Sequence, residues 1–548
     1  MGQKVLTVQP ADNVAVALQD LSAGETLDIN GISVRLIDDV RAKHKFLLTD
    51  LKKGDQIIMY GVLVAIANED LRKGNVLTTA NVHHAAAGFE VRAGHFEWQA
   101  PDTRPWNGRQ FMGYHRSDGK VGVANYWLVI PMVFCENRNV EVMRQALTQA
   151  LGYRSHDKYN DFARQLTHMY KTGKSTAQIL DADFNGADEW TEKPLLPNID
   201  GVKFLTHQGG CGGIRQDAIT LCGLLAGYIT HPNVAGATVL SLGCQNAQLS
   251  ILEDEIKKRS PNFDKPLILL DQQNIGKETD LLAQAIKQTF AGMVAASRQT
   301  RQPAGLDKLT IGLECGGSDG FSGISANPAV GYLSDLLVAM GGTVILSEFP
   351  ELCGVEQQLS DRCRDRADAE RFGALMARYS QRATEAGSGF DMNPSPGNIK
   401  DGLITDAIKS AGAAKKGGTS PVSAVLDYPE QVSKPGLNLL CTPGNDVEST
   451  TAEVGSGASI VLFTTGLGTP TGNPIAPVVK ISSNTILYDK MNDIIDLDTG
   501  TIIQGTETIE QAGARILDFV CEVASGKKVK AVMNGQDDFI PWKRGISL

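Results

Sequence analysis

Short apolar runs separated by turn residues fill the first 95 residues of the chain. The runs DNVAVAL, ETLDI, VRLI, KFLL, QIIMYGVLVAIA and NVLTT have the length of strands, and Gly, Asp and Asn lie between them. In LSAGETL, LKKGDQI and LRKGNVL a turn with glycine directly precedes a strand. The pattern predicts a small all-β domain over residues 1–95. Residues 96–110 contain two prolines and two tryptophans without a clear period, and they are predicted to be a linker.

From about residue 120 the apolar spacing changes to strands that are each followed by a helix. ANYWLVIPMVF precedes NVEVMRQALTQAL, VKFLTHQ precedes RQDAITLCGLLAGYI, and LTIGLECGG precedes NPAVGYLSDLLVAMGG. This alternation predicts an α/β catalytic region with mainly parallel sheets, in two halves, 111–302 and 303–548. Segment 153–199 is polar and is predicted to be an insertion of helix or loop. Segment 385–421 is rich in Gly, Ser, Pro and Lys and is predicted to be a long loop region.

Length and charge narrow the classes of function. A chain of 548 residues is too long for one core, which agrees with an α/β multidomain fold. The net charge of −10 argues against nucleic acid and anionic membranes as partners, but it leaves room for a small anionic substrate. The sequence has no run of 18 apolar residues, and its start, MGQKVLTVQP, lacks the apolar core of a signal peptide. We therefore expect a soluble, cytoplasmic protein.

The nine cysteines are scattered, without a CxxC pair, as is typical of reduced thiols in a cytosolic enzyme. Cys211, Cys244 and Cys315 each come directly after a predicted strand. Three thiolates that meet at strand ends could ligate iron, either singly or in a cluster with one open iron position. The alternative is that all three are small buried residues.

Polar segments flanked by glycine follow several other predicted strands. They are THQGGCGG, SLGCQN, LECGGSDGFSG, SEFPE, NPSPGN, TPGND and TTGLGTPTG. Because ligands of open α/β sheets bind at the carboxyl ends of the strands, these segments predict one shared polar site. TTGLGTPTG offers amides and hydroxyls for a carboxylate or phosphate, but it is neither a Walker loop nor GxGxxG, so a nucleotide site is not predicted.

Histidines and carboxylates near these loops are candidates for the chemistry. His207 lies four residues before Cys211, and His44 with Lys45 begins a strand of the small domain, where the pair could serve as base or anion contact. Each histidine could equally be a structural residue held by hydrogen bonds. Glu348 follows a strand, and like Glu351 and Asp319 it could bind a divalent cation or be a solvated or helix-capping acid.

Several of these motifs together resemble the altronate/galactarate dehydratase family over nearly the whole chain. DNVAVAL and HKFLLTDLKKGDQIIMYG resemble the SAF-type β domain of that family, and GYHRSDGKVGVANYW resembles the start of its catalytic part. The most specific matches are ECGGSDGFSGISANPAVG, NPSPGN and FTTGLGTPTG. The resemblance implies dehydration of a six-carbon sugar acid to a 2-keto-3-deoxy acid with a divalent metal, Fe²⁺ first and Mn²⁺ or Mg²⁺ as alternatives.

That reaction removes the proton next to the carboxylate and then the β-hydroxyl, so it needs a base, an acid and positive charge near the carboxylate. From their motif positions, His44, Lys45 and His207 are the predicted catalytic residues. The predicted metal site consists of Cys211, Cys244, Cys315 and Glu348. The predicted substrate contacts are Arg116, Asp319, Asn398, Lys400, Thr465 and Thr469.

The sequence departs from the family pattern in three places. Altronate-type members often carry an HVHxHN-like run where this chain has NVLTTAN, which excludes a metal role for that run. The common TTGRGTP is TTGLGTP here, so Leu467 replaces an arginine that could hold a second carboxylate. Segment 153–199 is longer than usual and is a candidate to reshape the entrance of the site or an oligomer contact.

Leu467 and the TPGND tail favour D-altronate over galactarate as substrate. Galactarate-type members also lack the histidine run, so its absence does not exclude activity. Three alternatives stay open: a galactarate or other aldarate dehydratase, a sugar-acid-binding relative without catalysis, and an iron–sulfur hydro-lyase. We expect a small-molecule sugar acid as the partner of the chain, no nucleic acid or membrane, and a homo-oligomer.

Overall fold

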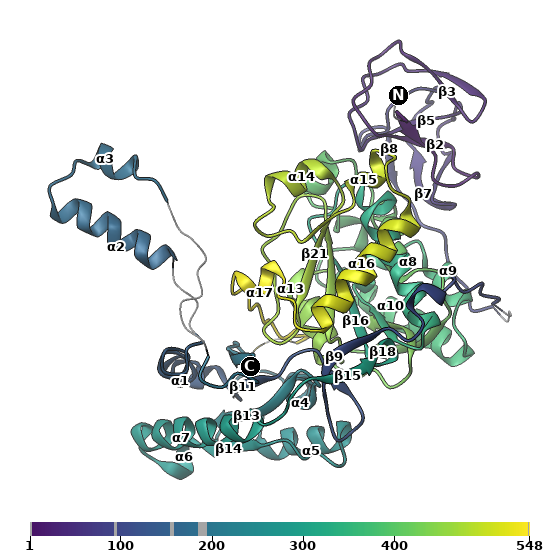
Figure 1. Cartoon of the computed structure of the whole chain (residues 1–548). Helices are drawn as coiled ribbons and strands as arrows, with labels where there is room; N and C mark the ends of the chain where they lie inside the picture. The colour runs from purple at the N-terminus through teal and green to yellow at the C-terminus, as the bar shows by residue number, and fades with distance from the viewer. Residues whose placement is uncertain (1–2, 93–95, 154–157, 185–193, 546, 548) are drawn as a thin grey trace.

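The N-terminal region is a small all-β domain, as the sequence predicts. The computed structural model describes residues 3–92, 96–153, 158–184, 194–545 and 547. Antiparallel strands form three small sheets in this domain, drawn in purple in Figure 1. Their bounds are β1 (Val5–Leu6), β2 (Val14–Ala17), β3 (Thr26–Ile29), β4 (Ile32–Arg35), β5 (Lys45–Leu47), β6 (Gln56–Met59), β7 (Val62–Ala67) and β8 (Val82–His84).

Two strand predictions in this domain need correction. The run QIIMYGVLVAIA is a hairpin of β6 and β7, because Tyr60 and Gly61 both have positive φ and form a tight turn between the strands. NVLTT is not a strand, since only an isolated bridge joins Val76 to Phe46, and β8 pairs with β7 instead. The buried strands β2 and β5 pair with each other, and their pairing fixes the place of the following loops.

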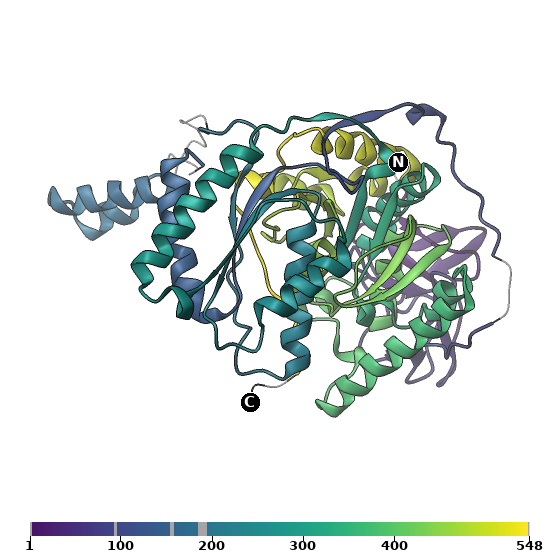
Figure 2. The same cartoon turned by 90° about the horizontal axis from the view of Figure 1, so that it is seen from below.

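A four-stranded parallel sheet forms the second region, in the order β12-β11-β13-β14. It is the lower sheet in Figure 1, and Figure 2 shows it from below with its helices. The strands are β11 (Tyr126–Pro131), β12 (Gly201–Phe204), β13 (Val234–Ser241) and β14 (Leu267–Asp271). The helices are α1 (Asn137–Ala150), α4 (Arg215–Thr230), α5 (Leu249–Arg259), α6 (Gln272–Ile275) and α7 (Glu278–Ala296).

A seven-stranded parallel sheet forms the third region, in the order β18-β19-β17-β16-β20-β21-β22. The strands are β16 (Thr310–Cys315), β17 (Thr343–Leu346), β18 (Val422–Asp427), β19 (Gly436–Cys441), β20 (Ile460–Thr465), β21 (Val478–Ser482) and β22 (Leu497–Asp498). The chain runs from β16 to β17 on one side and later returns to β20 on the other. The carboxyl ends of β16 and β20 therefore flank a topological switch point, where ligands of such sheets bind.

Helices pack on this sheet, and two short ones lie in the region 385–421, which was predicted to be loop. The longer ones are α8 (Ala326–Ala339), α10 (Arg366–Glu385), α13 (Asp446–Gly455) and α16 (Ile509–Ala524). The shorter ones are α9 (Glu356–Asp361), α11 (Pro396–Lys400), α12 (Asp406–Ala413), α14 (Thr485–Lys490), α15 (Gly500–Ile503) and α17 (Lys530–Met533). The loop prediction is corrected because side chains cap α11 and α12: Ser395 and Thr405 accept hydrogen bonds from their first-turn amides.

Two further parts complete the fold. A three-stranded antiparallel sheet of β9 (Gln110–His115), β10 (Val121–Gly122) and β15 (Gln302–Gly305) joins the two α/β regions. The predicted insertion contains α2 (Lys158–Lys171) and α3 (Thr176–Leu180), which extend away from the rest of the chain in both views (Figures 1 and 2). Its parts 154–157 and 185–193 lie outside the described residues. The predicted α/β multidomain fold with a small β domain is thus confirmed. Of the helices described, none combines the length and apolarity needed to span a bilayer.

Candidate active site

The small β domain contacts the large sheet through the loop before β5. Lys43 has a positive φ of 76°, an unfavourable conformation for a lysine. Its carbonyl oxygen lies against Gly320 and Gly402, and a Cβ atom on either glycine would collide with it. The two glycines therefore allow a close approach that places the Lys43 side chain at the carboxyl edge of the sheet.

Replacing Gly402 with Ala is expected to weaken this contact. Gly402 has a φ of +91°, so a side chain adds backbone strain of about 1–3 kcal/mol to the collision with Lys43. We expect a lower free energy of unfolding and a lower kcat/KM, measured by urea titration and steady-state kinetics. Gly88→Ala is the matched control, because a Cβ there meets no atom within 4 Å and its φ is not positive. Equal stability of the two variants would contradict this role.

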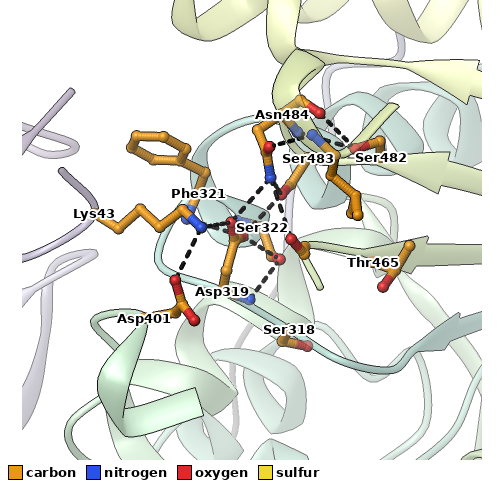
Figure 3. A network of polar contacts seen from close by, with 12 residues as sticks. Lys43, Ser318, Asp319, Phe321, Ser322, Asp401, Thr465, Ser482, Ser483 and Asn484 are labelled. Atoms are coloured by element: carbon orange, nitrogen blue, oxygen red, sulfur yellow. Dashed lines mark hydrogen bonds and ion pairs between the residues drawn. The ribbon is translucent and has the colours of Figure 1, made fainter. Parts of the chain in front are cut away.

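Lys43 forms ion pairs with two carboxylates of the large sheet. Its Nζ atom lies 3.0 Å from Asp319 Oδ2 and 3.1 Å from Asp401 Oδ1 (Figure 3). Asp319 is fully buried in the loop after β16. The carboxylates raise the pKa of Lys43 against the opposing effect of burial, so the ammonium stays charged. A positive charge from the β domain is thereby held at the switch point.

Asp319 also ties together the loops that surround it. Its Oδ1 accepts hydrogen bonds from the hydroxyls of Ser322 at 2.9 Å and Ser483 at 2.8 Å, and its Oδ2 accepts one from Asn484 Nδ2 at 3.2 Å (Figure 3). Ser483 and Asn484 follow β21, whereas Ser322 belongs to the loop after β16. The predicted substrate contact Asp319 is therefore already satisfied, and it organises the site around the Lys43 ammonium.

Lys45 and His44 reach the same edge from the β domain. Lys45 is buried with 1% exposure, and its Nζ donates a hydrogen bond to the carbonyl of Gly402 at 2.7 Å. Burial lowers the pKa of Lys45 to about 7, against the opposing field of Asp319. His44 Nε2 lies 3.1 Å from the carbonyl of Lys400, and burial lowers the pKa of this imidazole too. The lowered pKa makes the Lys45 amine a candidate base near neutral pH.

The predicted substrate contacts other than Arg116 lie on loops and a helix around this edge. Asn398 is buried at the start of α11 and donates a hydrogen bond to the Ser318 carbonyl at 2.8 Å, while the Lys400 side chain is exposed. Thr465 ends β20, and its hydroxyl accepts a hydrogen bond from Gly468 N at 2.9 Å. Thr469 lies farther along the same loop, where its hydroxyl meets that of Thr471.

Behind this rim, β16 and α13 enclose a group of carboxylates. Gly312, Glu314 and Gly316 share one face of β16, because side chains alternate along a strand. Glu453 packs over Gly312 and Asp446 over Gly316, so close that a Cβ on either glycine would collide with the carboxylate. Glu314 lies between them, and its carboxylate is within 4.8 Å of ligand atoms of Glu348 and Asp446.

These carboxylates lack the partners that buried charges need. Both oxygens of Glu314 and one oxygen each of Glu348, Glu351 and Glu453 are buried without a hydrogen bond to any described residue. Two lysine ammonium groups form ion pairs with these carboxylates: Lys416 with Glu348 at 2.7 Å and Lys409 with Glu351 at 2.6 Å. Burial and the neighbouring carboxylates raise the pKa of Glu314 well above its usual range, and burial raises that of Asp446 to about 6.

The three carboxylates Glu314, Glu348 and Asp446, called the carboxylate cage below, fit a divalent cation. The unpaired oxygens of Glu314 and Glu348 are hard donors of the type that Mg²⁺, Mn²⁺ and Fe²⁺ accept. Glu348 has a φ of 61°, a strained conformation for a glutamate and one that is typical of functional sites. A cation would supply the charge that two lysines do not supply for four buried carboxyl groups and the half-buried Asp446.

The structure divides the predicted metal ligands between two places, so their assignment to one site is corrected. Cys211 and Cys244 are exposed on loops of the four-stranded sheet. Cys315 is buried beside Glu314 but on the opposite face of β16, where its Sγ lies 2.7 Å from Ser318 Oγ. Of these four residues, only Glu348 belongs to a cluster of three ligand atoms within 4.8 Å among the described residues.

Arg116 and His207 also lie outside this site. The Arg116 guanidinium donates to the carbonyl of Pro232 at 2.7 Å and to Asn125 Oδ1 at 2.9 Å, so the prediction that it binds substrate is corrected. His207 donates from Nε2 to the Pro131 carbonyl at 2.7 Å, and its Nδ1 accepts from Gly209 N at 3.1 Å. With both ring nitrogens engaged and a pKa lowered to about 4 by burial, His207 positions a loop.

Five residues of this region were not singled out individually from the sequence: Lys43, Glu314, Lys409, Lys416 and Asp446. A charged residue inside the apolar strand IGLEC was a usable signal for Glu314, because a buried charge needs a partner or a metal. Lys43 adjoins the predicted pair His44 and Lys45. Asp446 ends the polar segment TPGND, which could have marked it, whereas nothing local distinguishes Lys409 or Lys416.

Comparison with known proteins decides the family. The profile described as "Altronate/galactarate dehydratase SAF domain" matches residues 3–85, "D-galactarate dehydratase/Altronate hydrolase, second domain" matches 113–297, and "D-galactarate/Altronate dehydratase, C-terminal" matches 306–547. The chain belongs to the altronate/galactarate dehydratase family. The resemblance seen in the sequence is confirmed, and the small β domain is a SAF domain.

Relatives match this dehydratase-family chain from end to end. It is 32% identical to the altronate dehydratase of Escherichia coli (strain K12) over 543 residues, which cover 99% of each chain. It is equally identical to the altronate dehydratase of Bacillus subtilis (strain 168), again with 99% of each chain covered. Identity to the galactarate dehydratase (L-threo-forming) of Escherichia coli is 29% over 95% of this chain and 93% of that one.

Proposed function

We propose that this chain is a hydro-lyase that dehydrates D-altronate to 2-keto-3-deoxy-D-gluconate and water in the site between the SAF domain and the seven-stranded sheet. Both altronate dehydratases match over a larger share of their length than the galactarate dehydratase does. The observation that carries the proposal is the geometry of one sheet edge. There Lys45, an amine with a pKa of about 7, and the Lys43–Asp319 ion pair meet the loop after β16, the strand that also carries Glu314 of the carboxylate cage.

Lys45 is the proposed base. Its burial leaves about half of the amine uncharged at pH 7, so it can take the proton from the carbon next to the substrate carboxylate. The electron pair left on that carbon forms the double bond as the β-hydroxyl departs. Burial lowers the pKa of His44, at the same edge, so its neutral imidazole is proposed to donate a hydrogen bond to the leaving oxygen, which takes up the proton held on Lys45 and leaves as water. The enol product then tautomerises to the 2-keto acid.

Positive charge must stabilise the negative charge that develops on the carboxylate. The Lys43 ammonium is fixed at the switch point by Asp319 and Asp401 and is the proposed contact of the chain to that carboxylate. Glu314, Glu348 and Asp446 would hold a divalent cation, with Fe²⁺ the first choice and Mn²⁺ or Mg²⁺ next. When bound, the cation would supply Lewis acidity toward substrate oxygens.

Turnover of the two acids side by side tests the substrate. Protein purified without oxygen and supplied with Fe²⁺ is expected to form 2-keto-3-deoxy acid from D-altronate faster than from galactarate. Faster turnover of galactarate would agree with the proposed dehydration reaction but would contradict D-altronate as the preferred substrate. Binding of either acid without product would instead identify a sugar-acid-binding relative that has lost catalysis.

Leu467 is expected to disfavour a second carboxylate. Its side chain lies next to Gly317 and Gly397, between the loop after β16 and the start of α11. Leu467→Arg should raise the ratio of kcat/KM for galactarate to that for altronate by about tenfold or more, because it adds a charged hydrogen-bond donor. Leu467→Met serves as the control of similar size without charge. An unchanged ratio in the arginine variant would show that Leu467 does not contact the far end of the substrate.

A further inference from the structure

Three exposed cysteines follow three neighbouring strands of the four-stranded sheet. Cys135 lies in the short 3-10 helix after β11, Cys211 in the loop after β12, and Cys244 in the loop after β13. The strands are parallel and adjacent, in the order β12-β11-β13, so all three loops leave the same edge. Exposed free thiols are unusual, since unpaired cysteines are among the most buried residues in proteins.

Hydrogen bonds join the three loops directly. Phe134 N, next to Cys135, donates to the Gly209 carbonyl at 3.1 Å. On the other side, Ala247 N donates to the Gly210 carbonyl at 3.1 Å, next to Cys211. Asn246 Nδ2 donates to the Gly213 carbonyl at 3.2 Å. The Cys211 loop thus lies between the other two, and each thiol is within two or three residues of a contact between loops.

Close packing and one histidine fix the central loop. Gly210 has a φ of +95°, and a Cβ there would collide with the Met132 carbonyl of the loop after β11. His207 links the Pro131 carbonyl to Gly209 N through its two ring nitrogens. These constraints hold the Cys211 backbone against the loop of Cys135, and they give His207 a positioning role.

A large cavity opens at this edge. Its volume is about 670 Å³, and its lining includes Phe134, Asn137 and the loop from Thr206 to Ile214, with Cys211. The C-terminal segment Phe539–Lys543 forms the opposite wall. A group bound by the thiols would therefore face a cavity large enough for a small organic acid.

We propose that Cys135, Cys211 and Cys244 hold an iron–sulfur cluster, with one iron that has no protein thiolate and faces this cavity. Three thiolates are the protein ligands that such a cluster with an open iron requires. Among the described residues the three thiols do not form a group with ligand atoms within 4.8 Å of one another. A single metal ion would hold its ligand sulfurs close together, so this spacing disfavours a single ion. A cluster holds its ligand sulfurs farther apart. The open iron would take an oxygen ligand, such as a carboxylate or hydroxyl of a small acid.

This site is separate from the carboxylate cage and is tested without turnover. Chain purified from cells without oxygen, or reconstituted with ferric iron, sulfide and dithiothreitol, is analysed for iron, acid-labile sulfide and visible absorption. We expect iron and sulfide in near-equal amounts and a brown chromophore. Each of Cys135→Ser, Cys211→Ser and Cys244→Ser should lose most of both, because a cluster with two thiolates left is labile.

Cys363→Ser is the matched control, since this partly buried cysteine lies at the end of α9. It should retain the chromophore, and circular dichroism should show that all four variants are folded. Iron without sulfide would overturn the cluster in favour of a single ion. Retention of the chromophore in the three cysteine variants, or its absence from the wild-type chain, would overturn the site itself. Dehydration without a cluster would leave the proposed function intact.

Discussion

Replacing Lys45 with Met is expected to lower kcat/KM for D-altronate by about 10²–10⁴-fold, the usual contribution of a general base. Methionine has similar length and removes the only atom of Lys45 that can take a proton. The hydrogen bond to the Gly402 carbonyl is lost as well, so the free energy of unfolding must be measured beside the kinetics. A folded variant with wild-type kcat/KM would contradict the assignment of the base.

The pH dependence gives Lys45 a signature that a structural lysine lacks. Because burial lowers the pKa of Lys45 to about 7, the base is protonated and inactive below that pH. Wild-type kcat/KM should therefore rise through pH 7 and level off above it. Lys45→Arg, which stays charged, should be inactive at every pH. Lys53→Met, at an exposed lysine of the same domain, should keep the wild-type profile.

Glu314→Gln is expected to abolish stabilisation of the chain by a divalent cation. Glu314 is fully buried, and burial and the neighbouring carboxylates raise its pKa well above the usual range, which favours the protonated form when no cation is bound. Glutamine resembles that protonated form, and the melting temperature without metal should change little. In the wild-type chain a cation at one hundred times its Kd should add about 2.7 kcal/mol to stability, and the variant should lose this gain.

The direction in which pH changes the affinity for the metal follows from the Glu314 carboxyl group. A cation must displace the Glu314 proton, so its apparent affinity should increase as pH rises. Thermal shift with Fe²⁺ or Mn²⁺ at two pH values measures both effects. Glu253→Gln, at an exposed position of α5, controls for the loss of a charge elsewhere. An equal shift in Glu314→Gln and wild type would exclude the carboxylate cage as the binding site.

The sequence pattern predicted the elements with strong periodicity and missed those that depend on distant contacts. Runs such as LTIGLECGG and NPAVGYLSDLLVAMGG became β16 and α8, because each carries enough apolar residues to define its own buried face. Helix α12 was missed inside a stretch predicted to be loop. It forms because Thr405 caps it and Ile408 packs into the core, which the local composition does not reveal.

The site was predictable in part for a similar reason. His44, Lys45 and the strand-end loops could be singled out because a parallel sheet gathers its loops at one edge. Cys315 rather than Glu314 was predicted to be a metal ligand. The two neighbours face opposite sides of β16, and the sequence does not say which side carries the carboxylate cage. The role expected for Arg116 failed because its carbonyl partners, such as that of Pro232, are set by the tertiary fold.

Turnover by metal-stripped protein is the most direct test of the central claim. The chain is purified without oxygen, stripped with chelator, and assayed for 2-keto-3-deoxy acid formation from D-altronate before and after addition of Fe²⁺. The account predicts no product from the stripped wild type, restored turnover with Fe²⁺, and no restoration in Glu314→Gln. Full turnover by the stripped chain, or restoration in Glu314→Gln equal to wild type, would contradict a sugar-acid dehydration that depends on the carboxylate cage.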